Sequence, residues 1–200
     1  MTQEEWNSAN DVFAMFKHLR ELGVLDRQLW RTFHCICSRS IWGFITDDRG
    51  RRAVEVAEQY LRGNSTRVDL VNAYAVVHAA QTEAWEAVAA LREPGGPASW
   101  SWPLTDEVDR AWEKYCAIGA AKDCVRDDAD DVLFTLIPES AASVRPWAES
   151  RADVLRQQPY LPPDEFRQRV LELWEEMRRE QERLQAGVLR ELVTGRRISH

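Results

Sequence analysis

Apolar residues recur three and four positions apart along almost the whole 200-residue chain. After Asp26, for example, this spacing links Leu29, Trp30, Phe33 and Cys37. Runs in which apolar and polar residues alternate, as they do in half-buried strands, are missing from the sequence. Because an α-helix repeats about every 3.6 residues, the observed spacing gathers apolar side chains on one helix face. The sequence therefore predicts an all-α fold.

Capping and turn residues divide this pattern into separate helices. Asp26 and either Ser65 or Thr66 can accept hydrogen bonds from a first helical turn, and Gly23 and Gly63 suit helix ends. The expected architecture is an irregular, mainly antiparallel bundle of roughly seven or eight helices, with a C-terminal helix about 28 residues long. The predicted segments cover about residues 10–22, 26–45, 47–61, 66–91, 105–122, 127–136, 147–155 and 164–192.

The chain is expected to form one helical domain over residues 1–200. A hydrophobic share of 44% and nine tryptophans are typical of a chain that folds around a core, and this length suits a single core. Residues 1–92 are predicted to form a compact N-terminal unit, and residues 105–200 the C-terminal helices. Residues 93–104 are predicted to form a loop, because their prolines and glycines cannot continue a helix.

The charge of the chain argues against binding to nucleic acid. There are 26 basic and 33 acidic residues, for a formal net charge of −7. A nonspecific hold on phosphates would require a basic patch that overcomes this field. The nearest candidate, formed by Arg49, Arg51 and Arg52, stands among acidic residues such as Asp47 and Glu55. We therefore expect the partner to be another protein.

The start of the chain and its cysteine content indicate a cytoplasmic protein. The opening run Met1-Thr2-Gln3-Glu4-Glu5 is acidic where a secretory signal would be positive. No apolar run approaches the roughly 18 residues of a membrane span, so no membrane contact is expected. Four cysteines are too few for a disulfide framework at this length and are expected to be reduced.

His34, Cys35 and Cys37 are the first residues to consider for metal binding or nucleophilic catalysis, because imidazole and thiolate are the usual ligands of zinc. On a helix, however, Cys35 and Cys37 point about 160° apart and cannot share one ion. His34 and Cys37 share a face but supply only two ligands. Buried thiols and a core histidine are therefore the preferred interpretation, with zinc as the alternative.

The run Asp127-Asp128-Ala129-Asp130-Asp131 carries the clearest chemical hint in the sequence. Asp127, Asp128 and Asp131 form a pattern that can hold Mg²⁺ against a diphosphate on a helix. An enzyme of this kind also needs carboxylates on an opposing helix. The candidates for that second set are Glu172, Glu175, Glu176 and Glu180. The simpler interpretation is that the aspartates stabilise the start of a short helix and the glutamates form a solvated charge face, with no cofactor.

Trp100 and Trp102 lie in the predicted loop, where residues two positions apart in an extended chain project to the same side. They either fold back over a groove between helices or anchor a partner protein, since tryptophan is favoured at interface hot spots. The long last helix offers a similar choice. Its apolar stripe is expected to dock on its own domain, and a partner helix is the alternative.

The N-terminal third carries motifs that resemble a known family. They are Glu5-Trp6, Cys35-Ile36-Cys37-Ser38-Arg39-Ser40-Ile41-Trp42 and Arg52-Ala53-Val54-Glu55-Val56-Ala57-Glu58. Over about residues 1–62 the chain resembles the repeat-companion proteins abundant in planctomycete genomes. Ser38 departs from the family pattern, which tends to have a third cysteine there. The family has no assigned activity, so the resemblance implies a helical fold and a bacterial origin and transfers no functional site.

These observations favour a non-catalytic protein-interaction or regulatory module, such as an adaptor, an inhibitor or an assembly component. The sequence contains no complete catalytic constellation, no phosphate-binding glycine loop and no standard zinc spacing. Trp100 and Trp102 are the candidate partner-binding residues. The alternative is a Mg²⁺-dependent enzyme that acts on a diphosphate or nucleotide through Asp127, Asp128 and Asp131.

Overall fold

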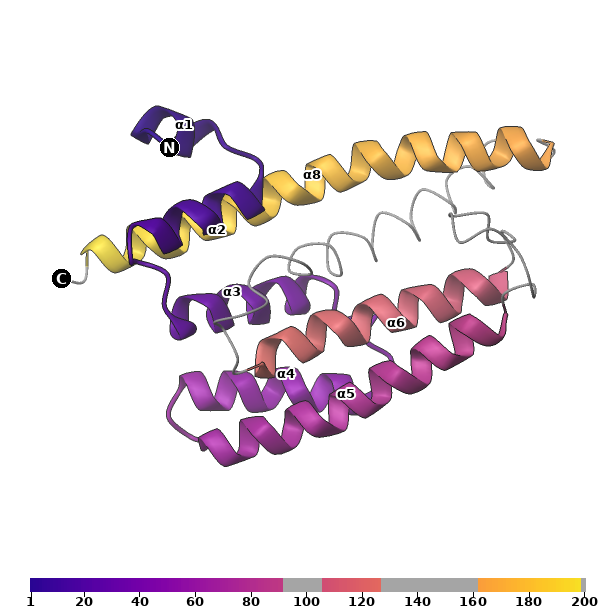
Figure 1. Cartoon of the computed structure of the whole chain (residues 1–200), viewed down its shortest axis with the longest axis horizontal. Helices are drawn as coiled ribbons and strands as arrows, with labels where there is room; N and C mark the ends of the chain where they lie inside the picture. Colours follow the sequence, from indigo (N-terminus) through magenta and orange to yellow (C-terminus); the bar gives the residue numbers. More distant parts are fainter. Residues whose placement is uncertain (92–105, 127–161, 199–200) are drawn as a thin grey trace.

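A computed structural model describes residues 1–91, 106–126 and 162–198 of the chain. Within these ranges it contains seven α-helices and no strand, which confirms the all-α prediction (Figure 1). The predicted segments 93–104, 127–136 and 147–155 lie outside the described residues. The helices are α1 (Gln3–Ser8), α2 (Val12–Glu21), α3 (Arg27–Ser40), α4 (Asp48–Leu61), α5 (Arg67–Ala90), α6 (Asp106–Val125) and α8 (Pro163–Ile198).

The helix ends follow from the predicted capping residues. Asp26 accepts a 2.6 Å hydrogen bond from the backbone N–H of Leu29, and Thr66 accepts one from that of Asp69 at 3.3 Å. These side chains satisfy N–H groups that have no partner inside a helix. Gly23 and Gly63 follow α2 and α4 with φ of 66° and 78°, a region that favours glycine because it has no Cβ.

Three elements differ from the predicted segments. The N-terminal lead forms the short helix α1, because Thr2 and Glu5 close a capping box at its start. Helix α3 ends at Ser40, and the chain turns through residues 41–44. Helix α8 has 36 residues rather than about 28. Its Gly187 and Gly195 do not end it, since a single glycine costs a helix only about 1 kcal/mol.

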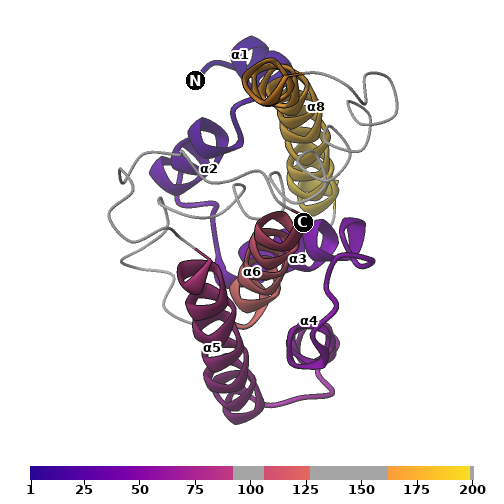
Figure 2. The ribbon, with the colours of Figure 1, turned by 90° about the vertical axis from the view of Figure 1, so that its right-hand side faces the viewer.

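Helix α6 lies among α3, α4 and α5, while α5 lies at the edge of the bundle (Figure 2). The central position of α6 depends on small side chains, because Ala117, Ala120 and Ala121 are all buried. A Cβ added to Gly50 of α4 would come within 3.6 Å of the Ala121 Cβ, so the two helices pack closely there. Consecutive helices run antiparallel from α2 to α6 (Figure 1). The N-terminal helices therefore share their core with a helix from the second half of the chain.

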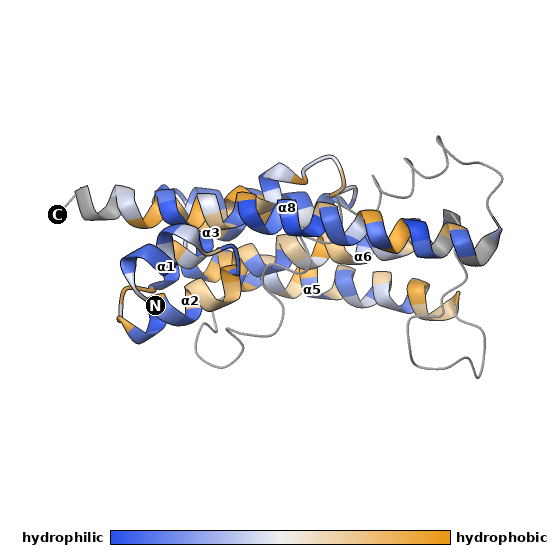
Figure 3. Cartoon of the chain, turned by 90° about the horizontal axis from the view of Figure 1, so that it is seen from above, coloured by the Kyte–Doolittle hydropathy of each residue, from blue (hydrophilic) through white to orange (hydrophobic). Residues whose placement is uncertain are grey.

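Helix α8 packs against α2 and α3 on the other side of the bundle (Figures 1 and 2). Ala186, Leu189 and Val193 of α8 are buried, and the Nη1 of Arg190 donates a 2.6 Å hydrogen bond to the carbonyl oxygen of Ala9. Hydrophilic and hydrophobic residues alternate along its visible surface, as in an amphipathic helix (Figure 3). None of the described helices is long and apolar enough to cross a membrane.

Candidate functional site

The residues that the sequence singled out for partner and metal binding are not part of the described structure. Trp100 and Trp102 fall in the gap before α6, and Asp127, Asp128 and Asp131 fall in the gap after it. Their predicted roles therefore stay predictions.

Of the four carboxylates proposed to complete a magnesium site, Glu172, Glu175 and Glu180 make ion pairs on the surface of α8. Glu172 contacts Arg169 at 3.0 Å, and Glu175 contacts Arg179 at 3.3 Å. These partners lie three and four residues away, the spacing of a solvated charge face. Within the ranges that the structure covers, no group of three or more His, Cys, Asp or Glu side chains is arranged to hold a metal ion.

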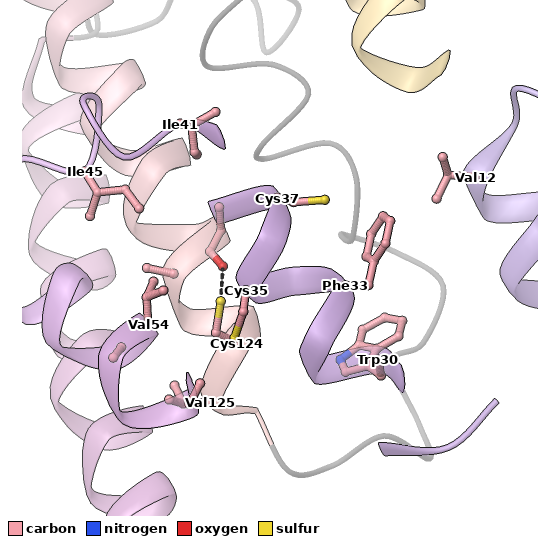
Figure 4. Close-up of a cluster of buried hydrophobic side chains, with 14 of the residues drawn as sticks. Val12, Trp30, Phe33, Cys35, Cys37, Ile41, Ile45, Val54, Cys124 and Val125 are labelled. Carbon is pink, nitrogen blue, oxygen red and sulfur yellow. Dashed lines mark hydrogen bonds between the residues drawn. The ribbon is translucent and has the colours of Figure 1, made fainter. Parts of the chain in front are cut away.

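His34, Cys35 and Cys37 are buried on α3 and point in different directions. The sulfur of Cys35 lies beside that of Cys124 on α6, whereas the sulfur of Cys37 points away from both (Figure 4). The His34 ring packs on Trp30, with 4.4 Å between the ring centroids. The expected divergence of the two cysteines is thus seen in the structure, and they do not share one coordination sphere.

The buried thiols are also poor nucleophiles. Burial raises the pKa of Cys37 and of Cys116 to about 12. The pKa of Cys124 is raised as well, by burial and by its hydrogen bond with Cys35. A reactive thiol requires a lowered pKa, because the thiolate is the attacking species. These three thiols are protonated at neutral pH and serve as packing groups.

Arg31 is a buried arginine of α3 that closes the end of α6. Its Nε and Nη2 donate hydrogen bonds of 3.1 Å to the carbonyl oxygens of Cys124 and Arg126, respectively. Its guanidinium lies 4.9 Å from the centroid of the Tyr60 ring on α4. The last carbonyls of a helix have no intrahelical partner and carry partial negative charge, which a cation balances. Arg31 thereby ties the end of α6 to α3 and α4.

Ser38 makes a second polar contact between the same two helices. Its Oγ donates a 3.1 Å hydrogen bond to the carbonyl oxygen of Ala120 and lies 3.2 Å from the Cys124 sulfur. Together with Arg31, it satisfies buried polar atoms of the α3–α6 interface, which we define by Arg31, His34, Ser38, Asp123 and Cys124.

Besides Cys124, two titratable groups of the α3–α6 interface have displaced pKa values. Burial raises the pKa of Asp123 to about 7, although the positive charges of Lys122 and Arg126 act in the opposite direction. Burial, with a smaller effect of Arg126, lowers the pKa of His34 to about 3. Such displacements are common at active sites. Here both side chains are buried, at 4% and 2% exposure, so a substrate cannot reach them without local opening of the fold.

The outward side of α5 lacks formally charged residues over more than three turns. Between positions 70 and 82 the sequence has no Asp, Glu, Lys or Arg. Val68 is 67% exposed and Val71 is 52% exposed, and Ala75, Ala79 and Thr82 are exposed as well. These five residues are spaced by three or four positions and share one side of the helix. We call them the α5 outer face.

An open groove of about 370 Å³ adjoins the α5 outer face, between α4 and α5. Its floor includes Ala53 and Val56 of α4, and Val76 of α5, 50% exposed, stands at its edge. Arg49, also on the lining, is held by bidentate hydrogen bonds to Asp47 and Glu83. Arg49, one of the three arginines considered as a basic patch, is therefore paired with neighbouring carboxylates, as the acidic surroundings in the sequence indicated.

Sequence analysis missed both the α3–α6 interface and the α5 outer face. Arg31 had a weak visible signal, since it lies four positions before Cys35 on a side of the helix that also carries His34 and Ser38. The uncharged run over residues 70–82 was also visible, but its exposure was not. Comparisons with family models, curated proteins and solved structures find no match to this chain. The resemblance to the repeat-companion proteins stays a prediction.

Proposed function

We propose that this chain is a non-catalytic protein-interaction module whose contact surface is the α5 outer face. The observation that carries the proposal is the exposure of Val68 and Val71 on a helix that has no formal charge between positions 70 and 82. Exposed helix faces are normally rich in charged residues, and a helix that is apolar all round is normally buried. A contiguous apolar surface on a folded protein is typical of an interaction site.

The chemistry of the described residues supports the same proposal. The displaced pKa values of His34 and Asp123 belong to buried groups, and the hydrogen bonds of Arg31 and Ser38 reach backbone carbonyls of the α6 segment. Arg31 and Ser38 therefore stabilise the arrangement of α3 and α6. The exposed apolar residues proposed to contact a partner lie elsewhere, on α5.

Affinity purification of the tagged chain from its native host tests the proposal, when the wild type is compared with Val71→Glu. We expect a protein to co-purify with the wild type in stoichiometric amount. An untagged second copy of the chain counts as such a protein. The Val71→Glu variant should lose it, because a carboxylate inside an apolar interface must be desolvated without a partner.

Leu184→Glu is the matched control, because Leu184 is 54% exposed on α8, close to the 52% of Val71. It should retain the co-purified protein. A partner that survives Val71→Glu and is lost with Leu184→Glu would assign the contact to α8. If no protein co-purifies with the wild type, the interaction proposal fails.

A further inference from the structure

We propose that the occupant of the α5 outer face is the α5 helix of a second copy of this chain, which packs against it in antiparallel orientation. The inference rests on the proposed function and specifies its partner. Three observations carry it: the distribution of charge along α5, the position of its small residues, and the absence of charge in between.

Helix α5 carries Arg67 and Asp69 near its start and Glu83 and Glu86 near its end. Asp69 is hydrogen-bonded to Ser65 and Thr66, and Glu83 accepts hydrogen bonds from Arg49, so both carboxylates are engaged within the chain. Arg67 precedes Val68 at the start of the outer face, and Glu86 follows Thr82 by one turn on the same side of the helix. Both residues are exposed. In an antiparallel pair, the Arg67 end of one copy lies against the Glu86 end of the other at both ends of the contact. A parallel pair would instead place Glu86 against Glu86, which is unfavourable.

The small residues of the outer face lie at the centre of this arrangement. The side that runs from Val68 to Glu86 has its midpoint at position 77, so antiparallel pairing about this point places Ala75 opposite Ala79 of the second copy. Both alanines are exposed. Small side chains at the crossing allow two helix axes to approach to about 8 Å. Val68 and Val71 of one copy then lie on one side of the crossing, and the same two residues of the other copy lie on the opposite side.

A second copy suits this surface because a twofold interface uses the same patch on both chains and must be self-complementary. An interface with net charge at its centre brings like charges together when it pairs with itself. The centre of the α5 outer face avoids this cost, because the helix has no Asp, Glu, Lys or Arg between positions 70 and 82. The contact is about 27 Å long, which corresponds to a small interface and a dimer of moderate affinity.

The first experiment is sedimentation velocity on the purified full-length chain over about 1 to 200 µM, the range expected for a small interface. We expect a concentration-dependent shift from monomer to dimer. Val71→Glu should remain monomeric over this range, and Leu184→Glu should behave like the wild type.

A charge exchange then tests the antiparallel register. Arg67→Glu alone places a second carboxylate against Glu86 of the other copy, and Glu86→Arg alone places arginine against arginine. Each single variant should dimerise about tenfold more weakly than the wild type. An equimolar mixture of the two variants should regain association, because each contact in the mixed dimer then joins opposite charges. Both substitutions favour the helix dipole of α5, so helix loss does not account for a weakened dimer.

Glu176→Arg, a reversal at an exposed residue of α8, is the matched control and should not change dimerisation. A wild type that stays monomeric to about 200 µM overturns this inference, as does a dimer that survives Val71→Glu. The proposed function still stands if the monomer co-purifies with another protein that Val71→Glu releases. Single reversals that weaken the dimer without recovery in the mixture contradict the antiparallel pairing.

Discussion

The α3–α6 interface and the α5 outer face combine polarity and exposure in opposite ways. At the α3–α6 interface polar side chains are buried, with Arg31 at 3% and Ser38 at 1% exposure. On the α5 outer face apolar side chains are exposed, with Val68 at 67%. Each region breaks the usual rule that apolar groups are buried and polar groups are solvated.

The two regions differ in whether the chain itself compensates for the buried polar groups or the exposed apolar groups. The Arg31 guanidinium donates hydrogen bonds to two carbonyls at the end of α6, so the cost of burying it is met within the chain. The α5 outer face has no such compensation, because nothing in the described chain covers Val68 or Val71. The buried polar region thus belongs to the architecture, and the exposed apolar region is suited to a partner.

Among the substitutions that separate the two regions, Arg31→Ala is expected to lower the free energy of unfolding most. The substitution leaves the carbonyl oxygens of Cys124 and Arg126 without these hydrogen bonds and opens a cavity. Unsatisfied buried groups cost about 1–3 kcal/mol each, so we expect a loss of about 3–5 kcal/mol in the free energy of unfolding. Urea denaturation followed by far-ultraviolet circular dichroism measures it.

Arg39→Ala is the control on the same helix. The side chain of Arg39 is 41% exposed and pairs with Glu58 at 2.7 Å. An exposed ion pair of this kind contributes at most about 1 kcal/mol. Equal losses for the two variants would contradict the structural role assigned to Arg31.

The second effect is a dependence of folding stability on pH, to which Asp123 and His34 contribute with opposite sign. The pKa of Asp123 rises from 3.8 to about 7 on folding, so its contribution to stability falls as pH increases from about 4 to 7. The pKa of His34 falls from 6.5 to about 3 on folding, so its contribution rises with pH between about 3 and 6.5. The two slopes oppose each other between about pH 4 and 6.5.

Asp123→Asn removes the pH dependence of stability that is due to Asp123 and leaves the one that is due to His34. Relative to the wild type, its unfolding free energy should increase by up to about 1.4 kcal/mol per pH unit between about pH 4 and 7. His34→Gln should show the reverse trend relative to the wild type between about pH 3 and 6.5. Urea titrations at intervals of about half a pH unit measure both differences, and parallel pH profiles for Asp123→Asn and wild type would show that Asp123 is not held protonated.

The smallest effect is expected on the exposed side of α5. Val77 is fully buried at 0% exposure, and Val77→Ala should cost about 2 kcal/mol from lost burial and the resulting cavity. Val71→Ala, at 52% exposure, should change the stability of the monomer by less than about 0.5 kcal/mol. Thermal melts at about 1 µM, the lower end of the expected association range, compare the two variants. A large loss for Val71→Ala at this concentration would mean that the α5 outer face is packed within the monomer.

Much of the fold could be predicted from the sequence because its signals are local. The N-caps Asp26 and Thr66 act within three residues, and Gly23 ends α2 through its own backbone conformation. The opposite directions of Cys35 and Cys37 follow from helix geometry alone. Less of the candidate site could be predicted, because neither the carbonyls that receive Arg31 nor the exposure of Val71 is a property of nearby residues.

The sequence by itself determined the helical class, most helix ends and the long amphipathic C-terminal helix, because hydrophobic period and capping act over a few residues. Only the tertiary structure decided which helix became central. Alanines at positions 117, 120 and 121 allow α6 to lie among α3, α4 and α5, and this leaves α5 at the edge. A helix with an uncharged stretch such as residues 70–82 is compatible with either place. Its exposure, and with it the candidate interaction site, follows from contacts between segments that are far apart in the chain.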